Sequence, residues 1–393
     1  MAMSLYIKMP MKNTKSKLKI AFVLDTTLDV EDGVQQYILV LGSWLKQQGH
    51  EVHYIVGQTK RTDIENIHSL TKNFSIRFNG NKVIYPLPTR NKKIRELLNK
   101  EKFDILHVQV PYSPVYGAKF VKYAPKTTAV IGTFHILPFG KIAYVGTWVL
   151  GLLLRKNLRR FDQQISVSKA NQTFSAKTFG ISSIVLPNMV KTKEFNPKPG
   201  FKRDNKIVEI FYLGRLTERK GCKYLLNALA MVQDNYPELN FSLKIAGKGE
   251  LLDNLIRQTK ELRLDNSVEF LGYVSNAEKA KLMQKADISV FPSFSGECFG
   301  IVLIEAMAAK SGVVVGGENP GYSSVLGSVE GSLVNVKDQE AFSELLYKHI
   351  SDENYRTKVF NQQQKLIDQY DYGVVGKQIL NIYLNCKKER NKT

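Results

Sequence analysis

The sequence predicts an α/β protein in which two lobes, each built on a doubly wound parallel sheet, face one cleft. The chain has 393 residues, more than one compact core normally holds. In both halves, short apolar runs of buried-strand length alternate with helical stretches, which is typical of parallel sheets. An interval rich in Pro, Lys and Asn, residues 187–206, separates the halves and indicates a linker.

The first half opens with a strand, a loop, a helix and a second strand. Residues 19–24 are mostly apolar, and Val34, Ile38 and Leu41 recur at spacings of three and four, as on one helix face. Gly49 can end this helix before the next strand. Strands are expected at 19–24, 51–56, 103–108, 128–133 and 164–167, and in the second half at 208–213, 242–246, 268–271, 288–291 and 313–315.

Charge is distributed unevenly along the chain. There are 56 Lys and Arg against 36 Asp and Glu, for a net charge of +20. Residues 1–200 hold 30 basic and 12 acidic side chains, whereas residues 201–393 hold 26 and 24, so the halves carry +18 and +2. A basic first lobe favours a polyanionic partner, either nucleic acid or an anionic membrane surface.

The cysteines and the lengths of the apolar runs indicate where in the cell the protein is expected. Three widely spaced residues, Cys222, Cys298 and Cys386, give neither a disulfide framework nor a zinc spacing, which favours the reducing cytosol. The longest apolar run, residues 142–154, has 13 residues, short of the roughly 20 that a spanning helix needs. The basic N-terminal stretch lacks the apolar core of a secretory signal. We expect a cytoplasmic protein without a transmembrane segment.

The first loop, residues 25–33, lacks the glycine pattern of a dinucleotide site, which disfavours a dehydrogenase. Gly33 stands at a helix N-terminus, where free backbone N–H groups can receive phosphate. The same glycine can equally serve only to shape the turn.

In the second half, Arg215, Arg219 and Lys220 lie in a loop directly after an apolar strand. Doubly wound sheets bind ligands at such carboxyl strand ends. Cations there would stabilise a diphosphate, above all as negative charge develops on it when it leaves. A solvated basic loop is the alternative.

Glu297 and Glu305 bracket a segment that is expected to turn helical around Phe299. Eight helical residues rise about 12 Å, whereas the two carboxylates of a retaining glycosidase lie about 5.5 Å apart. The pair is therefore expected to hold different parts of one long ligand. Amides at the helix start are candidates for binding phosphate, namely those of Phe299, Gly300, Ile301 and Val302.

Together these runs resemble the retaining, nucleotide-sugar-dependent glycosyltransferases of GT-B fold, in the large family that includes bacterial phosphatidylinositol mannosyltransferases and sucrose synthase. The resemblance extends from about Lys19 to the C-terminal helix. Its most specific element is the Glu-seven-residues-Glu motif in GECFGIVLIEAMAA, which is similar to the mannosyltransferase version. The runs GRLTERKG, IAGKGEL, VEFLGYVS, GTFH and ISVSKA support it.

The resemblance implies a role for each matching residue. Glu297 would bind hydroxyls of the donor sugar, and Glu305 would bind the nucleotide ribose. His135 would contact the transferred sugar near the reaction centre. Arg215 and Lys220 would hold the diphosphate.

Further matches and departures lie in the loops. Gly33 matches a glycine of the loop that closes over the phosphates, and Tyr273 and Val274 fall where the base is usually held. The chain departs from the family at Asp32 and Lys310, where relatives commonly have glycine. These departures leave the loop geometry open.

The GT-B architecture implies two Rossmann-like domains facing a central cleft. An acceptor domain at 18–190 and a donor domain at 207–370 would be joined by a linker at 191–206. Residues 1–17 are expected to form a basic mobile tail. Residues 371–393 are expected to form a helix that packs back on the N-terminal domain.

The family mechanism implied is transfer with retention, in which the departing nucleotide diphosphate helps deprotonate the acceptor hydroxyl on the same face. No enzymic nucleophile is then required. The sequence has no Asp-x-Asp motif beside a strand end, so a metal ion is not demanded. No cofactor is expected. The match around Glu297 favours GDP-mannose as donor, and the basic lobe favours a lipid acceptor such as phosphatidylinositol.

Other functions stay open. A UDP-sugar-dependent transferase acting on a soluble or polysaccharide-precursor acceptor is the main alternative, and an epimerase of sugar nucleotides shares the architecture. A nucleic-acid-binding protein ranks last, because the basic lobe lacks interleaved aromatics, a helix-turn-helix and zinc ligands.

Two segments of the basic half are candidates for contact with an anionic membrane or acceptor. Residues 90–100 combine an apolar stripe with a basic face made of Arg90, Lys92, Lys93 and Arg95. The second is the apolar run at 142–154, followed by Arg155 and Lys156. Either can instead be a surface helix with a core-facing stripe. We expect a peripheral protein on the inner face of the cell membrane.

Overall fold

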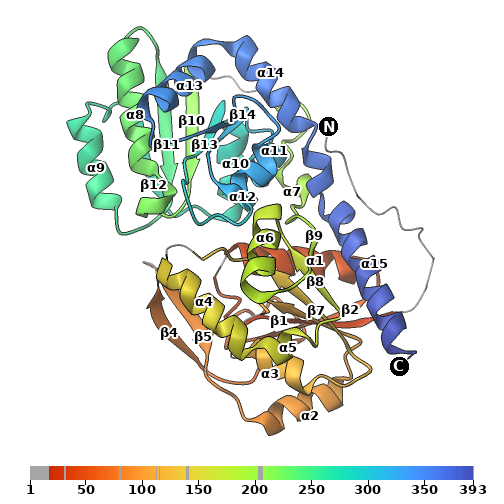
Figure 1. The fold of residues 1–393 in the computed structure, drawn as a ribbon. Helices are drawn as coiled ribbons and strands as arrows, with labels where there is room; N and C mark the ends of the chain where they lie inside the picture. The colour runs from red at the N-terminus through yellow and green to blue at the C-terminus, as the bar shows by residue number, and fades with distance from the viewer. Residues whose placement is uncertain are drawn as a thin grey trace.

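The computed structural model describes residues 17–30, 32–78, 81–111, 113–114, 116–138, 141–201 and 207–392. These residues form two α/β lobes, with the N-terminal lobe below the C-terminal lobe in Figure 1. Of the expected tail at 1–17, only Lys17 belongs to the described residues, and the 202–206 part of the expected linker lies outside them.

The N-terminal lobe is built on a seven-stranded parallel sheet with the order β3-β2-β1-β6-β7-β8-β9. Its strands are β1 (Lys19–Val23), β2 (Glu51–Val56), β3 (Ile67–Ser69), β6 (Ile105–Gln109), β7 (Ala129–Phe134), β8 (Gln163–Ser166) and β9 (Ile184–Val185). Strands β4 (Asn73–Phe78) and β5 (Asn81–Pro86) form an antiparallel pair. The helices are α1 (Gly33–Gln47), α2 (Asn91–Glu101), α3 (Tyr116–Tyr123), α4 (Lys141–Leu153), α5 (Arg155–Leu158) and α6 (Lys169–Phe179).

The C-terminal lobe repeats the plan with a six-stranded parallel sheet in the order β12-β11-β10-β13-β14-β15. Its strands are β10 (Val208–Leu213), β11 (Phe241–Ala246), β12 (Val268–Gly272), β13 (Ile288–Phe291), β14 (Val313–Gly317) and β15 (Leu333–Val334). The remaining helices are α7 (Thr192–Phe195), η1 (Glu218–Lys220), α8 (Cys222–Asn235), α9 (Leu252–Glu261), α10 (Asn276–Lys285), α11 (Ile301–Ala308), α12 (Pro320–Leu326), α13 (Gln339–Ser351), α14 (Glu353–Gln364), η2 (Ile367–Tyr370) and α15 (Tyr372–Arg390).

The predicted fold class is confirmed, and each of the ten expected strands corresponds to a strand of one of the two sheets. The interior strands β6 and β14 are buried along their whole length because helices cover both faces of the sheets. The sequence missed the antiparallel pair β4 and β5 and, in the two parallel sheets, β3, β9 and β15, which have only two or three residues each. The three short parallel strands cannot produce a recognisable apolar run.

Two local expectations are corrected. The expected linker at 191–206 is not wholly loop, because it contains the short helix α7. The helix expected to start around Phe299 begins at Ile301, since Gly300 adopts a φ of 101° that an α-helix cannot contain.

A further position, Lys310 after α11, has a φ of 53°, in the left-handed region that favours glycine. The chain therefore keeps the conformation usual for glycine while carrying a lysine, at a cost of about 1 kcal/mol.

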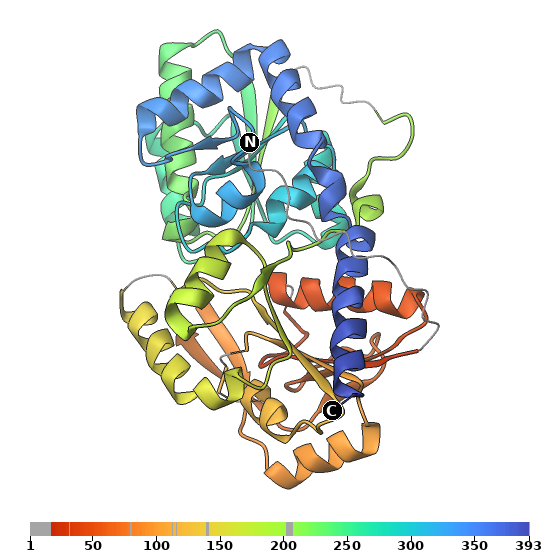
Figure 2. The ribbon, with the colours of Figure 1, turned by 45° about the vertical axis from the view of Figure 1, so that its right-hand side comes forward.

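The C-terminal helix α15 leaves the C-terminal lobe and runs beside α1 of the N-terminal lobe (Figure 2). Its residues Val375, Ile379 and Tyr383 are buried in the same apolar cluster as α1 and β1. The Tyr383 hydroxyl lies 2.6 Å from Nδ1 of His107 on β6, and Nε2 of His107 lies 2.6 Å from Oγ1 of Thr133. The last helix of the chain is thus part of the N-terminal core.

The two candidate membrane segments are both helices, but their apolar residues are placed differently. In α2, Ile94, Leu97 and Leu98 are buried in a core cluster, so the expected apolar membrane face is wrong for this helix. The basic side chains of α2 and its N-cap are exposed, namely Arg90, Lys92, Lys93 and Arg95. Figure 1 shows α2 at the end of the lobe farthest from the C-terminal lobe. In contrast, α4 exposes apolar side chains.

Among the described residues, no helix is both long and apolar enough to cross a membrane.

We expect Tyr383→Phe to lower the free energy of unfolding by about 1–3 kcal/mol, because it leaves a buried nitrogen of His107 without its partner. Tyr372→Phe is the matched control on the same helix. The Tyr372 hydroxyl is 3.5 Å from Gln47 in an exposed position, so its loss should change stability by less than about 0.5 kcal/mol. Urea denaturation measures both values. Equal stabilities of the two variants would show that the bond to His107 contributes nothing.

Candidate active site

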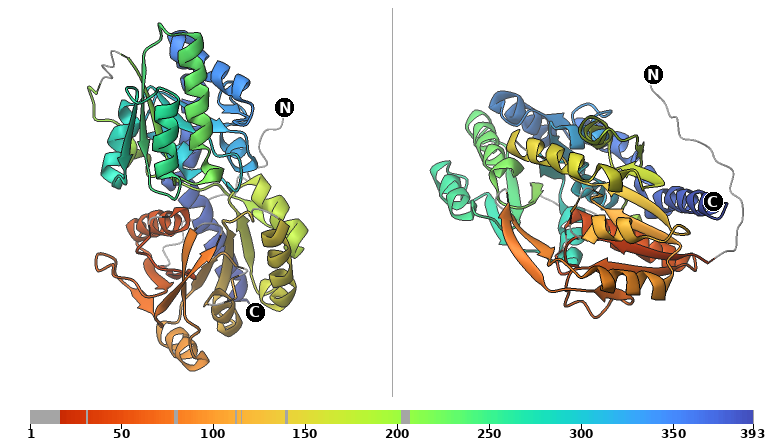
Figure 3. Two further views of the ribbon diagram at one scale, coloured as in Figure 1. Left: turned by 90° about the vertical axis from the view of Figure 1, so that its left-hand side faces the viewer. Right: turned by 60° about the horizontal axis from the view of Figure 1, so that its bottom comes forward.

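The candidate site lies where the carboxyl ends of the strands of both lobes meet. His135 follows β7 of the N-terminal lobe, while Arg215 follows β10, Tyr273 follows β12 and Glu297 follows β13. In Figure 3, the left view shows α1 on the side of the N-terminal lobe that faces the C-terminal lobe. Open parallel sheets bind their ligands at this edge. Both sheets therefore direct their loops into one cleft.

Glu297 is the centre of a buried ion cluster. Its Oε1 atom lies 2.7 Å from Nη1 of Arg219 and 2.9 Å from Nζ of Lys220. It also accepts a hydrogen bond from Oγ of Ser293 at 2.8 Å. The carboxylate side chain is 13% exposed. The structure thus brings together Glu297 and two of the loop cations that the sequence singled out, Arg219 and Lys220.

Opposing effects set the pKa of Glu297. Burial alone would raise it, but Lys220 and Arg219 hold the pKa of this carboxyl down at about 2. Burial lowers the pKa of Lys220, and the Glu297 charge opposes that effect. Glu297 is therefore ionised at neutral pH. It can accept hydrogen bonds from hydroxyl groups, and it has no proton to donate.

Close backbone contacts fix the two loops that carry this cluster. Gly221, with a φ of 74°, follows Lys220, and a Cβ added there would lie 2.0 Å from the carbonyl oxygen of Pro292. The Arg219 carbonyl accepts a hydrogen bond from the Phe294 backbone N–H at 3.2 Å, and the Ser293 hydroxyl oxygen lies 3.1 Å from the same carbonyl. The loop after β10 and the loop after β13 therefore form one unit.

The N-termini of two helices meet beside the cluster. Gly33, the first residue of α1, packs against α11 so closely that an added Cβ would lie 3.0 Å from Cδ1 of Ile301. Ile301 and Val302 form the first turn of α11, where the backbone N–H groups have no helical partner. Phe299 is buried in the core of the C-terminal lobe. Helix N-termini carry partial positive charge, so both lobes present partial positive charge where α1 and α11 begin.

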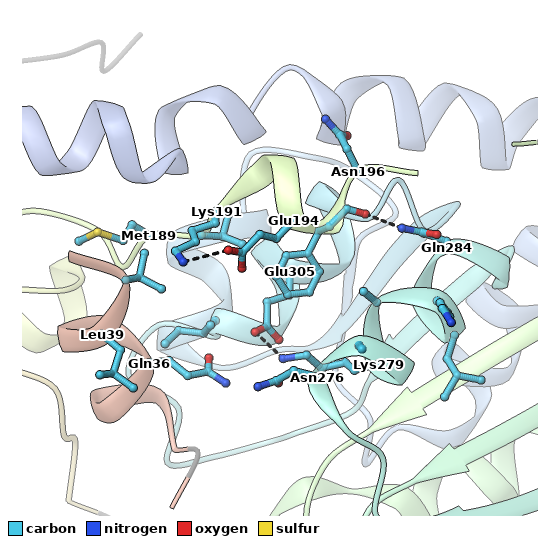
Figure 4. Close-up of a pocket in the computed structure, with 18 of the residues that line it drawn as sticks. Gln36, Leu39, Met189, Lys191, Glu194, Asn196, Asn276, Lys279, Gln284 and Glu305 are labelled. Atoms are coloured by element: carbon cyan, nitrogen blue, oxygen red, sulfur yellow. Dashed lines mark hydrogen bonds and ion pairs between the residues drawn. The ribbon is translucent and has the colours of Figure 1, made fainter. Parts of the chain in front are cut away.

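Glu305 lies in a different part of the cleft. Its Oε1 atom is 2.7 Å from Nζ of Lys279 on α10, and both side chains are 8% exposed. They line a cavity of about 920 Å³ between α1, α7, α10 and α11 (Figure 4). The Lys279 ammonium also lies 5.3 Å from the ring centroid of Phe195. Glu297 and Glu305 therefore have separate cations and separate surroundings.

His135 faces the cleft from the N-terminal lobe. Its Nε2 lies 2.8 Å from Oε1 of Gln109, and its ring packs edge-on against Tyr37 with centroids 4.8 Å apart. Burial lowers the pKa of His135 to about 3. The imidazole is therefore neutral, and because Oε1 of Gln109 can only accept, Nε2 carries the proton and Nδ1 is an acceptor. Such a ring can accept a hydrogen bond from a sugar hydroxyl.

The other predicted residues lie at the edge of the site. Arg215 is exposed, and its carbonyl accepts a hydrogen bond from Tyr212 at 3.2 Å. Tyr273 is 64% exposed, with the Lys248 ammonium 5.8 Å from its ring centroid, whereas Val274 packs partly buried against the core. The basic residues of α2 are not brought into the cleft.

Several residues of the site escaped sequence reasoning. Arg219 was expected among the loop cations, but its pairing with Glu297 was not. Lys279 and Gln109 sit in ordinary helix and strand positions with no local signal. Asn171 on α6 donates to the carbonyl of Ile136 at 3.2 Å and to Sγ of Cys298 at 3.0 Å, a contact between lobes. Only the tertiary fold creates these pairs.

Outside the cleft, the described residues include one group with metal-ligating atoms within 4.8 Å of one another, His53, His68 and Glu101. Here Lys19 already supplies a cation, with its ammonium 2.6 Å from Glu101. The two ring nitrogens of His53 contact His68 and Glu51, each at 2.8 Å. Lys19 and Glu51 are thus already paired with members of this group.

Buried histidines make stability depend on pH. Burial lowers the pKa of His135 and His107 to about 3 and that of His349 to about 4, whereas the ordinary value is 6.5. The unfolded chain therefore binds protons below pH 6.5 that the folded chain does not bind. We expect the free energy of unfolding to fall between pH 6.5 and 5.5, with a slope that approaches about 1.4 kcal/mol per pH unit for each histidine.

Urea midpoints at pH 8.0, 6.5 and 5.5 measure this effect, in a range where most carboxylates stay ionised. The midpoint should be level above pH 6.5 and fall below it. A midpoint that rises on acidification would contradict the burial of these rings.

Two family models match consecutive parts of the chain. Residues 32–194 match the model of glycosyltransferase family 4, and residues 192–366 match the model of glycosyl transferases group 1. Together the matches cover most of both lobes, including every residue of the Glu297 cluster.

Relatives of known activity match over nearly the whole chain. The phosphatidyl-myo-inositol mannosyltransferase of Mycolicibacterium smegmatis is 29% identical over 373 residues, which cover 93% of each chain. The protein of the same name from Mycobacterium tuberculosis is 28% identical over 377 residues, covering 93% of this chain and 96% of the relative.

Solved structures share the architecture. A glycosyltransferase from Rickettsia africae superposes with a TM-score of 0.74 at 20% identity, covering 94% of this chain and 98% of the other. The Anabaena protein HepE in complex with UDP-glucose gives a TM-score of 0.73 at 18% identity, covering 94% of this chain and all of the other. The chain thus has the GT-B fold and belongs to the glycosyltransferases that these two family models describe, enzymes that transfer a sugar.

Proposed function

We propose that this glycosyltransferase moves mannose from GDP-mannose to a lipid acceptor such as phosphatidylinositol, at the inner face of the cell membrane and with retention of configuration. The observation that carries the proposal is the buried cluster of Glu297, Lys220 and Arg219 beside two helix N-termini. The names of the mycobacterial relatives support mannose and phosphatidylinositol as the sugar and the acceptor.

The charges of the site suit a nucleoside diphosphate sugar. Lys220 and the first turn of α11 offer an ammonium and free amides to the diphosphate, and Arg215 stands exposed at the end of β10. Glu305 in the adjoining cavity can accept hydrogen bonds from ribose hydroxyls. Tyr273 and Val274 lie at the end of β12, where the base would be held. The donor then spans both glutamates.

The reaction would be a substitution on one face of the sugar. The bond between the anomeric carbon and the diphosphate oxygen breaks, and the acceptor oxygen forms the new bond from the same side. The acceptor proton passes to the departing diphosphate. Lys220 and the helix termini stabilise the charge that develops there, while Glu297 and His135 hold sugar hydroxyls. Glu297 is well suited to this binding role because it stays ionised between two cations.

A UDP-sugar-dependent transfer to a soluble or polysaccharide-precursor acceptor is the alternative. It uses the same diphosphate contacts and differs in the base, the sugar and the acceptor. The basic N-terminal lobe, with its net charge of +18 from 30 basic and 12 acidic residues, favours an anionic lipid acceptor over a neutral polysaccharide.

We expect Lys220→Met to reduce turnover by roughly 10²- to 10³-fold, because it removes a fixed charge aimed at the leaving group. Lys223→Met is the matched control. Lys223 lies three residues away, is 38% exposed and pairs with Glu218 at 2.5 Å on the surface, so its loss should leave turnover near normal. Initial rates of donor consumption are compared after thermal melts show that both variants fold. A near-normal rate for Lys220→Met would place the diphosphate elsewhere.

With GDP-mannose and vesicles that contain phosphatidylinositol, we expect a mannosylated lipid with the same anomeric configuration as the donor. Proton NMR of the product reads that configuration. An inverted product would contradict the mechanism, and product formed only from UDP sugars would select the alternative.

Thermal shift with GDP, UDP and their sugar conjugates serves as the control, since a ligand that binds only the folded chain raises its melting temperature without any acceptor present. Selective stabilisation by GDP compounds is the expected result, and silence towards every nucleotide would contradict the donor site.

A further inference from the structure

Helix α4 carries a continuous apolar face that the fold leaves uncovered. Its exposed large side chains fall at helical spacings of three and four, with exposed fractions of 58% for Val145, 47% for Trp148, 43% for Val149, 51% for Leu152 and 75% for Leu153. Elsewhere among the described residues, exposed side chains of this size do not form such a run on one helix. An exposed apolar stripe of this kind normally marks an interaction surface.

The opposite side of α4 is firmly packed. Gly151 is buried against α6, where an added Cβ would lie 2.5 Å from Cδ1 of Phe179. Figure 2 shows α4 at the left edge of the N-terminal lobe, with its outer side facing away from both sheets. The helix is thus held by one face while the other carries the stripe.

The charged residues that neighbour the stripe in the sequence are all basic. No Asp or Glu occurs between Asp104 and Asp162 in the sequence. Arg155, Lys156 and Arg159 follow the stripe directly and are exposed. A stripe with Trp and Leu that is flanked by Lys and Arg is the composition of helices that lie in the interface of an anionic bilayer.

The position of α4 links this face to the site. The helix starts six residues after His135, and Ile136, next to that histidine, is 44% exposed. A surface bound to α4 would therefore lie beside the acceptor side of the cleft. With 13 residues the helix is about 20 Å long, too short to cross the roughly 30 Å hydrocarbon layer, so it would lie in the plane of the interface.

We propose that the exposed face of α4, from Val145 to Leu153, docks the enzyme on the surface of an anionic phospholipid bilayer, with Arg155, Lys156 and Arg159 contacting the headgroups. This inference deepens the proposed function and rests on its lipid acceptor for the choice of a bilayer over a protein partner. The apolar docking surface lies on α4, because the apolar residues of the basic helix α2 are already buried in the core.

The test uses the full chain and vesicles of phosphatidylcholine with and without phosphatidylglycerol, free of donor and acceptor. Co-sedimentation should show binding to the anionic vesicles that weakens as salt is raised. Val149→Gln combined with Leu152→Gln should lower the affinity for anionic vesicles at least tenfold. Val374→Gln is the matched control, since Val374 on α15 has the same 43% exposure as Val149. This variant should bind anionic vesicles as tightly as the unchanged chain.

Fluorescence gives a local readout. The chain has two tryptophans, Trp44, which is 4% exposed, and Trp148. Anionic vesicles should shift the emission to shorter wavelength, and Trp148→Phe should abolish the shift while vesicle binding persists. Binding without any shift, or binding that survives the paired α4 substitutions, would overturn the assignment of α4. Sedimentation velocity tests for self-association. Self-association that is lost in the variant with both Val149→Gln and Leu152→Gln would overturn bilayer docking and show that α4 binds a second copy of the chain.

Thermal stabilisation by GDP and UDP compounds, measured on the same samples, separates this inference from the proposed donor. A chain that binds a nucleotide but no anionic vesicle would overturn the docking surface and leave the donor site standing. A chain that binds vesicles through α4 but no nucleotide would support docking and contradict the donor site.

Discussion

A carboxylate buried between two cations is the interaction on which this site depends. Glu297 is costly to bury alone, and it is stable in the cleft because Arg219, Lys220 and Ser293 surround it at hydrogen-bond distance. The same contacts hold the loop after β10 against the loop after β13. This close approach requires glycine at position 221, because a Cβ there would clash with the carbonyl oxygen of Pro292. Charge pairing thus fixes the geometry of the two loops that carry this cluster.

Specific contacts hold the two lobes together. Asn171 reaches Cys298 across the cleft, and Gly33 lets α1 approach α11 at Ile301. The helix α15 then connects the C-terminal lobe to the N-terminal core, where Tyr383 closes a chain of hydrogen bonds through His107. Helix α15 therefore connects the lobes away from the loops that carry Glu297 and His135. A ligand that contacts Glu297, Glu305 and His135 together must touch both lobes.

Much of this arrangement could be predicted from the sequence. The short strands, the pairs formed between elements and the buried side of each helix could not, for physical reasons. Long strands with two covered faces produce apolar runs, so the ten longer parallel strands were predicted, while β9 and β15, with two residues each, leave no such signal. The Glu297 motif and Lys220 were predictable from their loops, but the pairing of Glu305 with Lys279 depends on the distance between α10 and α11. Composition also does not reveal which side of a helix meets the core. Helices α2 and α4 both combine apolar and basic residues, and only packing shows that Leu98 is buried and Leu153 exposed.

A crystal structure of the chain with GDP tests the central claim most directly. The diphosphate is predicted to lie between Nζ of Lys220 and the first-turn amides of α11 at Ile301 and Val302, with the ribose on Glu305. Glu297 should remain paired with Arg219 and face the position of the sugar. A diphosphate bound away from Lys220, or a ribose that makes no contact with Glu305, would contradict the claim that this ion cluster forms the donor site.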